Sequence, residues 1–159
     1  LKRAVHPAPP PGSQVPAGME LVASQGLALT DKSGRSVPAS VLARKAVALY
    51  FSAHWCPPCR QFTPVLKAFY EGARSGGEAL EIIFVSGDKS EAEGQAYFRE
   101  HHGDWMMLGF AQGAQLSQRF AVRGIPSLIG IDSKGNVVVP NAREDVQAAA
   151  SSGGAGAAA

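Results

Sequence analysis

The segment Trp55-Cys56-Pro57-Pro58-Cys59-Arg60 constrains the fold more than any other part of the sequence, because it holds both cysteines of the 159-residue chain. Residues 46–51, just before it, form an apolar run with the length and the β-branched and aromatic content of a buried strand. Residues 61–72, just after it, carry apolar side chains at helical spacing, namely Phe62, Val65, Leu66 and Phe69. The sequence therefore predicts a strand, a turn that carries the cysteines, and a helix.

The two prolines place the cysteines relative to the start of this helix. Proline is tolerated in a first helical turn, where its missing N–H costs nothing, so Pro57 and Pro58 put Cys56 at or beside the N-cap. A helix N-terminus carries partial positive charge and favours the thiolate, which is the nucleophilic form of cysteine. We expect Cys56 to attack and Cys59, one turn further on, to resolve by closing a Cys56–Cys59 disulfide.

Two other interpretations of the cysteine pair are weaker. A static structural disulfide is disfavoured because so short a loop removes little entropy from the unfolded chain. A structural zinc site needs four ligands, but the four histidines stand at positions 6, 54, 101 and 102 and there is no second cysteine pair. We therefore expect thiol redox chemistry with no metal and no cofactor.

Composition excludes several other classes of protein. The length suits a single domain with a real core, and no stretch approaches the apolar length of a membrane span. The net charge of +2 comes from interspersed signs with no basic stripe, which argues against a nucleic-acid partner. An isolated cysteine pair suits a reducing compartment, so we expect a cytoplasmic protein, with the nucleus or an organelle left open.

Proline and small-residue content predicts the boundaries of the domain. Residues 1–18 contain five prolines and no apolar pattern, which predicts an extended arm of polyproline character. The arm is either a disordered leader or a docking arm for a partner. We expect residues 19–150 to form the domain and residues 151–159, rich in small residues, to form a low-complexity tail.

The N-terminal half of the domain reads as a hairpin followed by a strand–helix–strand unit. Residues 19–30 alternate loosely between apolar and polar side chains, and a turn signal at 31–35 predicts a small hairpin over 27–37. A short helical turn at 37–42 leads into the strand before the cysteines. Leu80–Ser86 is a second apolar strand. With the helix between them, the two strands predict a right-handed parallel crossover.

The C-terminal half predicts two helices, a hairpin and a closing helix. We expect helices over 90–102, with Ser90 as N-cap, and over 112–120. A strand at 128–131, a turn at 132–136 and a partner strand at 137–139 predict a hairpin, and residues 142–150 can close the fold as a helix. The apolar patch Trp105 to Phe110 belongs either to the core or to an exposed contact surface.

Taken together, these motifs resemble the thioredoxin fold over about residues 27–146. The shared features are the Trp-Cys-Pro-Pro-Cys turn after a strand, a helix with Pro64 inside it, and Arg123-Gly124-Ile125-Pro126 before an antiparallel hairpin. The segment 51–64 and the long stretch before Pro126 are similar to the tryparedoxin and nucleoredoxin branch. The resemblance implies an α/β thioredoxin fold, a central mixed sheet flanked by helices, here with an N-terminal hairpin extension.

The resemblance also implies roles for residues around the cysteines. Pro126 is expected as a cis proline facing the cysteines, and Ile125 is expected to offer backbone groups to an extended substrate. Trp55, Pro57 and Pro58 complete the expected substrate surface, and Pro64 is expected to kink the helix. Thioredoxins carry a buried acidic residue on the central strand six positions before the first cysteine. This chain has Tyr50 there, so the resemblance assigns no proton acceptor to Cys59.

Two functional hypotheses follow from these observations. The first is a thiol–disulfide oxidoreductase that reduces protein disulfides, with a thiol or a reductase as electron donor. The second is a thioredoxin-fold binding or structural subunit of a larger assembly, docked through the proline-rich arm or through the Trp105–Phe110 patch. The intact cysteine motif favours the first.

Overall fold

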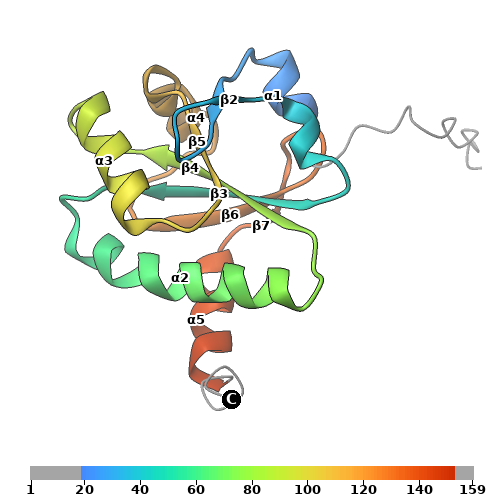
Figure 1. The fold of residues 1–159 in the computed structure, drawn as a ribbon, viewed down its shortest axis with the longest axis vertical. Helices are drawn as coiled ribbons and strands as arrows, with labels where there is room; N and C mark the ends of the chain where they lie inside the picture. The colour runs from blue at the N-terminus through green and yellow to red at the C-terminus, as the bar shows by residue number, and fades with distance from the viewer. Residues whose placement is uncertain (1–18, 153–159) are drawn as a thin grey trace, which may run out of the picture.

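A seven-stranded mixed sheet forms the centre of the computed structural model, which describes residues 19–152 (Figure 1). The strand order is β2-β1-β5-β4-β3-β6-β7. The strands are β1 (Leu29–Thr30), β2 (Ser36–Val37), β3 (Ala46–Ser52), β4 (Leu80–Ser86), β5 (Met106–Leu108), β6 (Ser127–Ile131) and β7 (Val137–Val139). The helices are α1 (Met19–Ser24), η1 (Ala39–Leu42), α2 (Pro57–Ser75), α3 (Glu91–His101), η2 (Phe110–Gln112), α4 (Gly113–Arg119) and α5 (Ala142–Ser152).

The pairing of the central strands confirms the predicted topology. β3 pairs parallel with β4 and antiparallel with β6, so the strand before the cysteines lies in the middle of the sheet. Parallel strands require a crossover connection, and α2 supplies it. The predicted hairpins are also present, since β1 pairs antiparallel with β2, and β6 pairs antiparallel with β7. The fold is therefore an α/β thioredoxin fold with an N-terminal hairpin.

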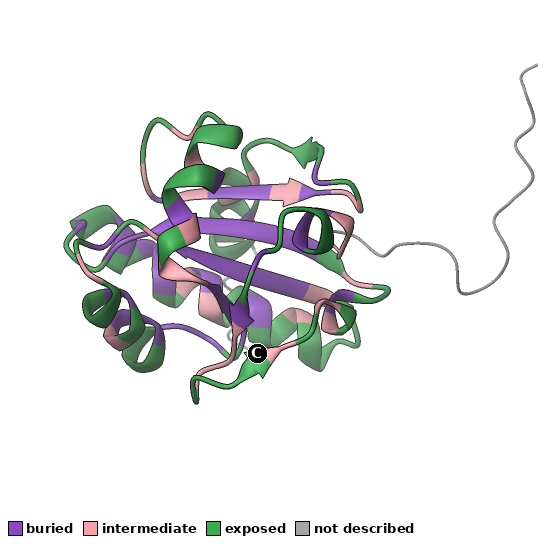
Figure 2. Ribbon diagram, turned by 90° about the horizontal axis from the view of Figure 1, so that it is seen from above, coloured by how far each residue is buried: buried purple, intermediate pink, exposed green. Residues whose placement is uncertain are grey.

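Helices cover both faces of the sheet, with α2 and α5 on one side and α1 and α4 on the other (Figure 1). Successive side chains of a strand point to opposite faces, so β3 divides its residues between two cores. Val47, Leu49 and Phe51 pack with α1 and α4. Ala48 and Tyr50 pack with α2, α3 and α5. Because both faces are covered, the central strands are buried along almost their whole length (Figure 2).

The structure corrects or extends the sequence-based expectations at three places. The loosely alternating stretch at the start of the domain forms helix α1, whose Leu21 and Val22 are buried, because two apolar neighbours on one short helical turn serve the core as well as a strand would. The Trp105–Phe110 patch contains strand β5, which was not predicted, and the burial of Trp105 through Leu108 confirms the core alternative for this part of the patch. Helix α5 continues two residues beyond the predicted end at 150, to Ser152. Residues 1–18 and 153–159, which include the proline-rich arm, lie outside the described part of the chain.

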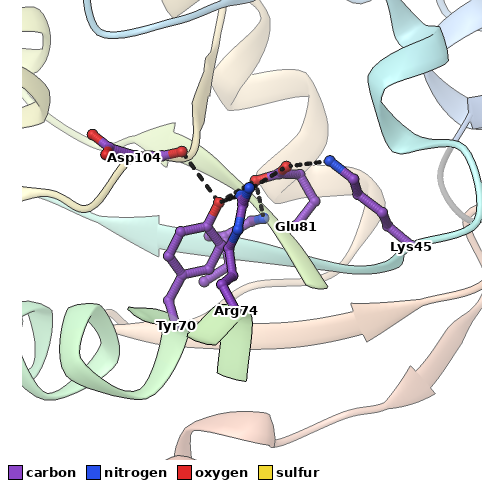
Figure 3. Close-up of polar contacts among 6 residues, drawn as sticks. Lys45, Tyr70, Arg74, Glu81 and Asp104 are labelled. Atoms are coloured by element: carbon purple, nitrogen blue, oxygen red, sulfur yellow. Dashed lines mark hydrogen bonds and ion pairs between the residues drawn. The ribbon is translucent and has the colours of Figure 1, made fainter. Parts of the chain in front are cut away.

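A charged network closes the end of the sheet where β4 begins (Figure 3). The Glu81 carboxylate is buried, lies 3.1 Å from Lys45 Nζ and 3.8 Å from Arg74 Nη1, and accepts a 2.9 Å hydrogen bond from the Tyr70 hydroxyl. Tyr70 also donates to the Asp104 carbonyl oxygen and accepts from Arg74. A buried charge is tolerated only when it is paired and hydrogen-bonded, so this network lets Glu81 occupy an interior position.

Within residues 19–152, no helix combines the length and the apolar character that crossing a bilayer requires.

Replacing Glu81 with Ala is expected to lower the free energy of unfolding by about 2 kcal/mol, because it removes the charge-assisted hydrogen bond from Lys45 and one of the two acceptors of the Tyr70 hydroxyl. Urea denaturation measures the loss. Glu78→Ala is the matched control, since Glu78 is exposed three residues earlier and its truncation is expected to leave the midpoint unchanged. Equal midpoints for the two variants would contradict the role given to the network.

Candidate active site

The cysteines lie where β3 leads into α2, toward the left of Figure 1. β3 ends at Ser52, and α2 begins at Pro57 with Cys56 as its N-cap. The Cys56 backbone is extended (φ −95°, ψ 110°), and its Sγ accepts a 3.3 Å hydrogen bond from the Cys59 N–H. The sulfur therefore serves as the side-chain cap of the helix, and the predicted N-cap is confirmed.

Both cysteines are free thiols, but they differ in their surroundings. Cys59 is completely buried, whereas Cys56 retains 4% of its surface, beside the exposed prolines 57 and 58. Burial is the main cause that raises the pKa of the Cys59 thiol, and the hydrogen bond with Cys56 raises it further. The more accessible sulfur is thus the one that caps the helix.

The loop that leads into β6 faces the cysteines. The Ile125–Pro126 peptide bond is cis, as the resemblance implied. The Cys56 thiol donates to the Ile125 carbonyl oxygen at 3.7 Å, and the Ile125 side chain packs against the cysteine cluster. Arg143 of α5 supports the loop from behind by donating from Nη1 to the Pro126 carbonyl oxygen at 3.3 Å. Ile125 and Pro126 therefore lie at the predicted place, beside the first cysteine.

Trp55 and its neighbours form the rim of the site. The Trp55 side chain is 49% exposed, and its indole N–H donates to the Gly87 carbonyl oxygen at 2.9 Å. The loop after β4 also contributes the buried Asp88, whose carboxylate accepts from the His54 N–H at 2.8 Å and from the Ser86 hydroxyl at 2.7 Å. Asp88 thus anchors the turn just before Cys56.

His54 is exposed, but its ring is held in a defined place. Its ring stacks on His101 with centroids 5.1 Å apart and lies 5.3 Å from the Tyr97 ring. Arg60 donates to the His54 carbonyl oxygen at 2.5 Å. Within residues 19–152 no three histidine, cysteine or acidic side chains gather as ligands for a metal ion.

Four buried hydroxyls lie beneath Cys59, and we call them the hydroxyl cluster: Tyr50, Ser52, Thr63 and Tyr97. Thr63 Oγ1 lies 2.7 Å from the Tyr50 hydroxyl and 2.6 Å from the Tyr97 hydroxyl, which in turn lies 2.8 Å from Ser52 Oγ. Thr63 donates to the Cys59 carbonyl oxygen at 2.9 Å. Burial raises the pKa of Tyr50 far above its usual range, so this phenol stays neutral.

The arrangement brings into one site the thiol of Cys56, which caps the helix and is the less buried of the two, the completely buried thiol of Cys59 and the Ile125 carbonyl oxygen. The residues singled out from the sequence all lie there, namely Trp55, Cys56, Pro57, Pro58, Cys59, Ile125 and Pro126. The sequence reasoning missed Ser52, Thr63 and Tyr97. The only available signal was that Tyr50 and Ser52, two apart on a strand, share one face.

Comparisons with known sequences agree with this geometry. A family model described as thioredoxin-like matches residues 44–137. Mouse nucleoredoxin is 39% identical over 121 residues, which are 74% of this chain and 27% of that protein. The tryparedoxin of Trypanosoma brucei brucei is 39% identical over 116 residues, which are 70% of this chain and 76% of that protein. The chain thus spans about a quarter of the length of the nucleoredoxins it matches.

Comparisons with solved structures give the same result. Native tryparedoxin I from Crithidia fasciculata superposes with a TM-score of 0.73 at 36% identity, over 83% of this chain and 92% of that chain. A thioredoxin from Wuchereria bancrofti superposes with a TM-score of 0.70 at 45% identity, over 83% of this chain and 95% of that chain. The chain therefore belongs to the thioredoxin-like family, in the branch that contains the nucleoredoxins and the tryparedoxins.

Proposed function

We propose that this protein is a thiol–disulfide oxidoreductase that reduces protein disulfides through a Cys56/Cys59 dithiol–disulfide cycle. The observation that carries the proposal is the unequal placement of the two sulfurs. Cys56 Sγ caps α2 and Cys56 retains 4% of its surface beside the exposed prolines 57 and 58, whereas Cys59 lies completely buried one turn behind it. Family membership in a thioredoxin-like branch supports the same chemistry.

The cycle has two exchange steps. The Cys56 thiolate attacks one sulfur of the substrate disulfide, that S–S bond breaks, and the first substrate thiolate leaves and takes up a proton. The Cys59 thiolate then attacks the Cys56 sulfur, the mixed disulfide breaks, and the second substrate thiolate leaves. The substrate disulfide is reduced by two electrons, and the two cysteines lose two electrons as they form the Cys56–Cys59 disulfide. A thiol or a reductase acts as electron donor and restores both thiols.

The faces around Cys56 suit an extended polypeptide substrate. The Ile125 carbonyl oxygen lies beside the attacking sulfur, and the half-exposed Trp55 indole and the exposed prolines 57 and 58 supply apolar contacts. A peptide passing the Ile125–Pro126 loop finds backbone groups on one side and apolar surface on the other. We assign substrate binding to these residues and propose a reducing compartment such as the cytoplasm, which an isolated cysteine pair favours.

The alternative of a docked structural subunit loses one of its two supports. Trp105 through Leu108 are core residues, and Gly109 and Phe110 at the end of the patch are half-buried. The proline-rich arm at 1–18 lies outside the described residues, and its role as a docking arm stays a prediction, as does the proposed division of the chain into 1–18, 19–150 and 151–159.

Replacing Cys56 with Ser is expected to abolish insulin-disulfide reduction, because Cys59, the other of the two cysteines in the sequence, is completely buried and cannot begin the exchange. Cys59→Ser is expected to stop the cycle at the mixed disulfide, which non-reducing electrophoresis and intact-mass measurement detect. The assay offers dithiothreitol, glutathione and a thioredoxin reductase separately, so the preferred donor is measured in the same experiment. Reduction that persists in Cys56→Ser would contradict the mechanism.

The second exchange step is expected to accelerate with rising pH. Resolution needs the Cys59 thiolate, and burial raises the pKa of that thiol, so at neutral pH only a small fraction is ionised. Each unit of pH below the Cys59 pKa should change the thiolate fraction and the resolution rate by about tenfold. Stopped-flow measurement of product release between about pH 6 and 9 checks this slope. A resolution rate that does not change over that range would show that Cys59 ionisation does not limit the step.

A further inference from the structure

The turn before Cys56 is held at its backbone by two charged side chains that come from different elements. His54, within that turn, donates its N–H to the Asp88 carboxylate at 2.8 Å, and its carbonyl oxygen accepts from Arg60 Nη1 at 2.5 Å. Asp88 belongs to the loop after β4, and Arg60 belongs to the first turn of α2. Charge-assisted hydrogen bonds are roughly twice as strong as neutral ones. We call these two contacts the His54 clamp.

Asp88 is itself held in place by its own loop. Its carboxylate is buried, and within residues 19–152 no lysine or arginine nitrogen lies within 4.0 Å of it. A buried charge without an ion pair must be satisfied by hydrogen bonds. Asp88 accepts from the Ser86 hydroxyl at 2.7 Å, and its own N–H donates to that hydroxyl at 3.0 Å. Helix α3 packs on this pair, since a Cβ on Gly94 would lie 2.6 Å from Ser86 Oγ.

The Trp55 indole depends on these contacts more than on packing. Its side chain is 49% exposed, so the interior does not fix it, and its N–H donates to the Gly87 carbonyl oxygen at 2.9 Å. Both partners of this bond belong to the segments that the His54 clamp joins, because Trp55 follows His54 and Gly87 precedes Asp88. Loss of either contact of the clamp therefore loosens the indole.

Cys56 is held by a different set of contacts. Its N–H donates to the Ala53 carbonyl oxygen at 3.3 Å, and its carbonyl oxygen accepts the backbone N–H of Arg60 at 3.1 Å. Its Sγ accepts the Cys59 N–H at 3.3 Å. None of these bonds uses the side chain of Arg60 or of Asp88. Loss of the His54 clamp is therefore expected to disturb the indole and to leave the sulfur in place.

We propose that Arg60 and Asp88 are positioning residues for substrate binding, which clamp His54 and so hold the Trp55 indole where a polypeptide disulfide contacts it. The inference rests on the proposed function, which assigns Trp55 to the substrate surface. The His54 clamp acts on the affinity for polypeptide substrates and not on the exchange of sulfur bonds, because the contacts that hold Cys56 are separate from it. A binding surface keeps its geometry only when contacts behind it lock its side chains.

The first test observes the indole directly by ¹⁵N relaxation, which reports motion on the picosecond-to-nanosecond timescale. The chain has two tryptophans, so two indole N–H signals are expected. Arg60→Ala is expected to lower the order parameter of the Trp55 indole and to leave that of Trp105 unchanged, because Trp105 is buried and donates to His102. Arg60→Lys keeps a donor for the His54 carbonyl oxygen and is expected to keep the indole ordered. A Trp55 order parameter that Arg60→Ala leaves unchanged overturns the proposal.

The second test is the steady-state reduction of a disulfide-bonded peptide. Arg60→Ala and Asp88→Ala are each expected to raise KM by about tenfold, the effect of losing one charge-assisted hydrogen bond. The kcat and the rate at which iodoacetamide labels Cys56 are expected to stay unchanged. Asp88→Asn keeps an acceptor for the His54 N–H and is expected to restore KM. Arg99→Ala is the matched control, since Arg99 is an exposed arginine of α3 outside the His54 clamp, and its KM is expected to equal that of the unmodified protein.

A double-mutant cycle shows whether the His54 clamp acts through the indole. If it does, adding Arg60→Ala to Trp55→Ala raises KM no further. A further rise of about tenfold in the double variant, an unchanged KM in both single variants, or a loss of Cys56 labelling overturns the role of the clamp and leaves the dithiol cycle standing. Failure of the unmodified protein to reduce the peptide overturns the proposed function instead, and the relaxation measurement still decides whether the clamp holds the indole.

Discussion

The N-terminus of α2 is capped by a sulfur atom, because Cys56 Sγ accepts the Cys59 N–H at 3.3 Å. This contact fixes the first sulfur at the end of the central strand and makes the first turn of the helix the link between both cysteines. The other parts of the site are placed relative to it. The Ile125 carbonyl oxygen faces the same sulfur, and the loop after β4 holds Trp55 and the turn before Cys56.

The interior beneath Cys59 is polar but uncharged. Burying a charge next to a second ionisable group is costly, and the fold instead places four hydroxyls there whose hydrogen bonds satisfy one another. The charged network of Glu81 lies at the opposite end of β4, where Lys45 and Arg74 reach it from the rim. The interior beneath Cys59 thus relies on neutral hydroxyls, whereas the far end of the sheet holds a charged structural network.

Much of the fold and of the site was predictable from local patterns. The strand before the cysteines, the N-cap at Cys56 and the hairpin after Pro126 follow from periodicity, proline placement and turn residues, and each is confirmed. Helix α1 was not, because a six-residue segment with loose alternation satisfies both periods. Strand β5 was not predictable, because a three-residue apolar strand has the same sequence pattern as an apolar contact patch until its neighbours are known.

The hydroxyl cluster could not be predicted from local sequence patterns, for a different reason. Tyr50 and Ser52 share a face of β3, but Thr63 comes from α2 and Tyr97 from α3, and only the packed helices bring them together.

The most direct test of the unequal placement of the two cysteines is the rate at which iodoacetamide labels each of them in the reduced native protein, measured by peptide mass spectrometry. We expect labelling at Cys56 with Cys59 protected until the protein unfolds, because Cys59 is completely buried. Equal labelling of both cysteines would contradict the assignment of Cys56 as the attacking thiol.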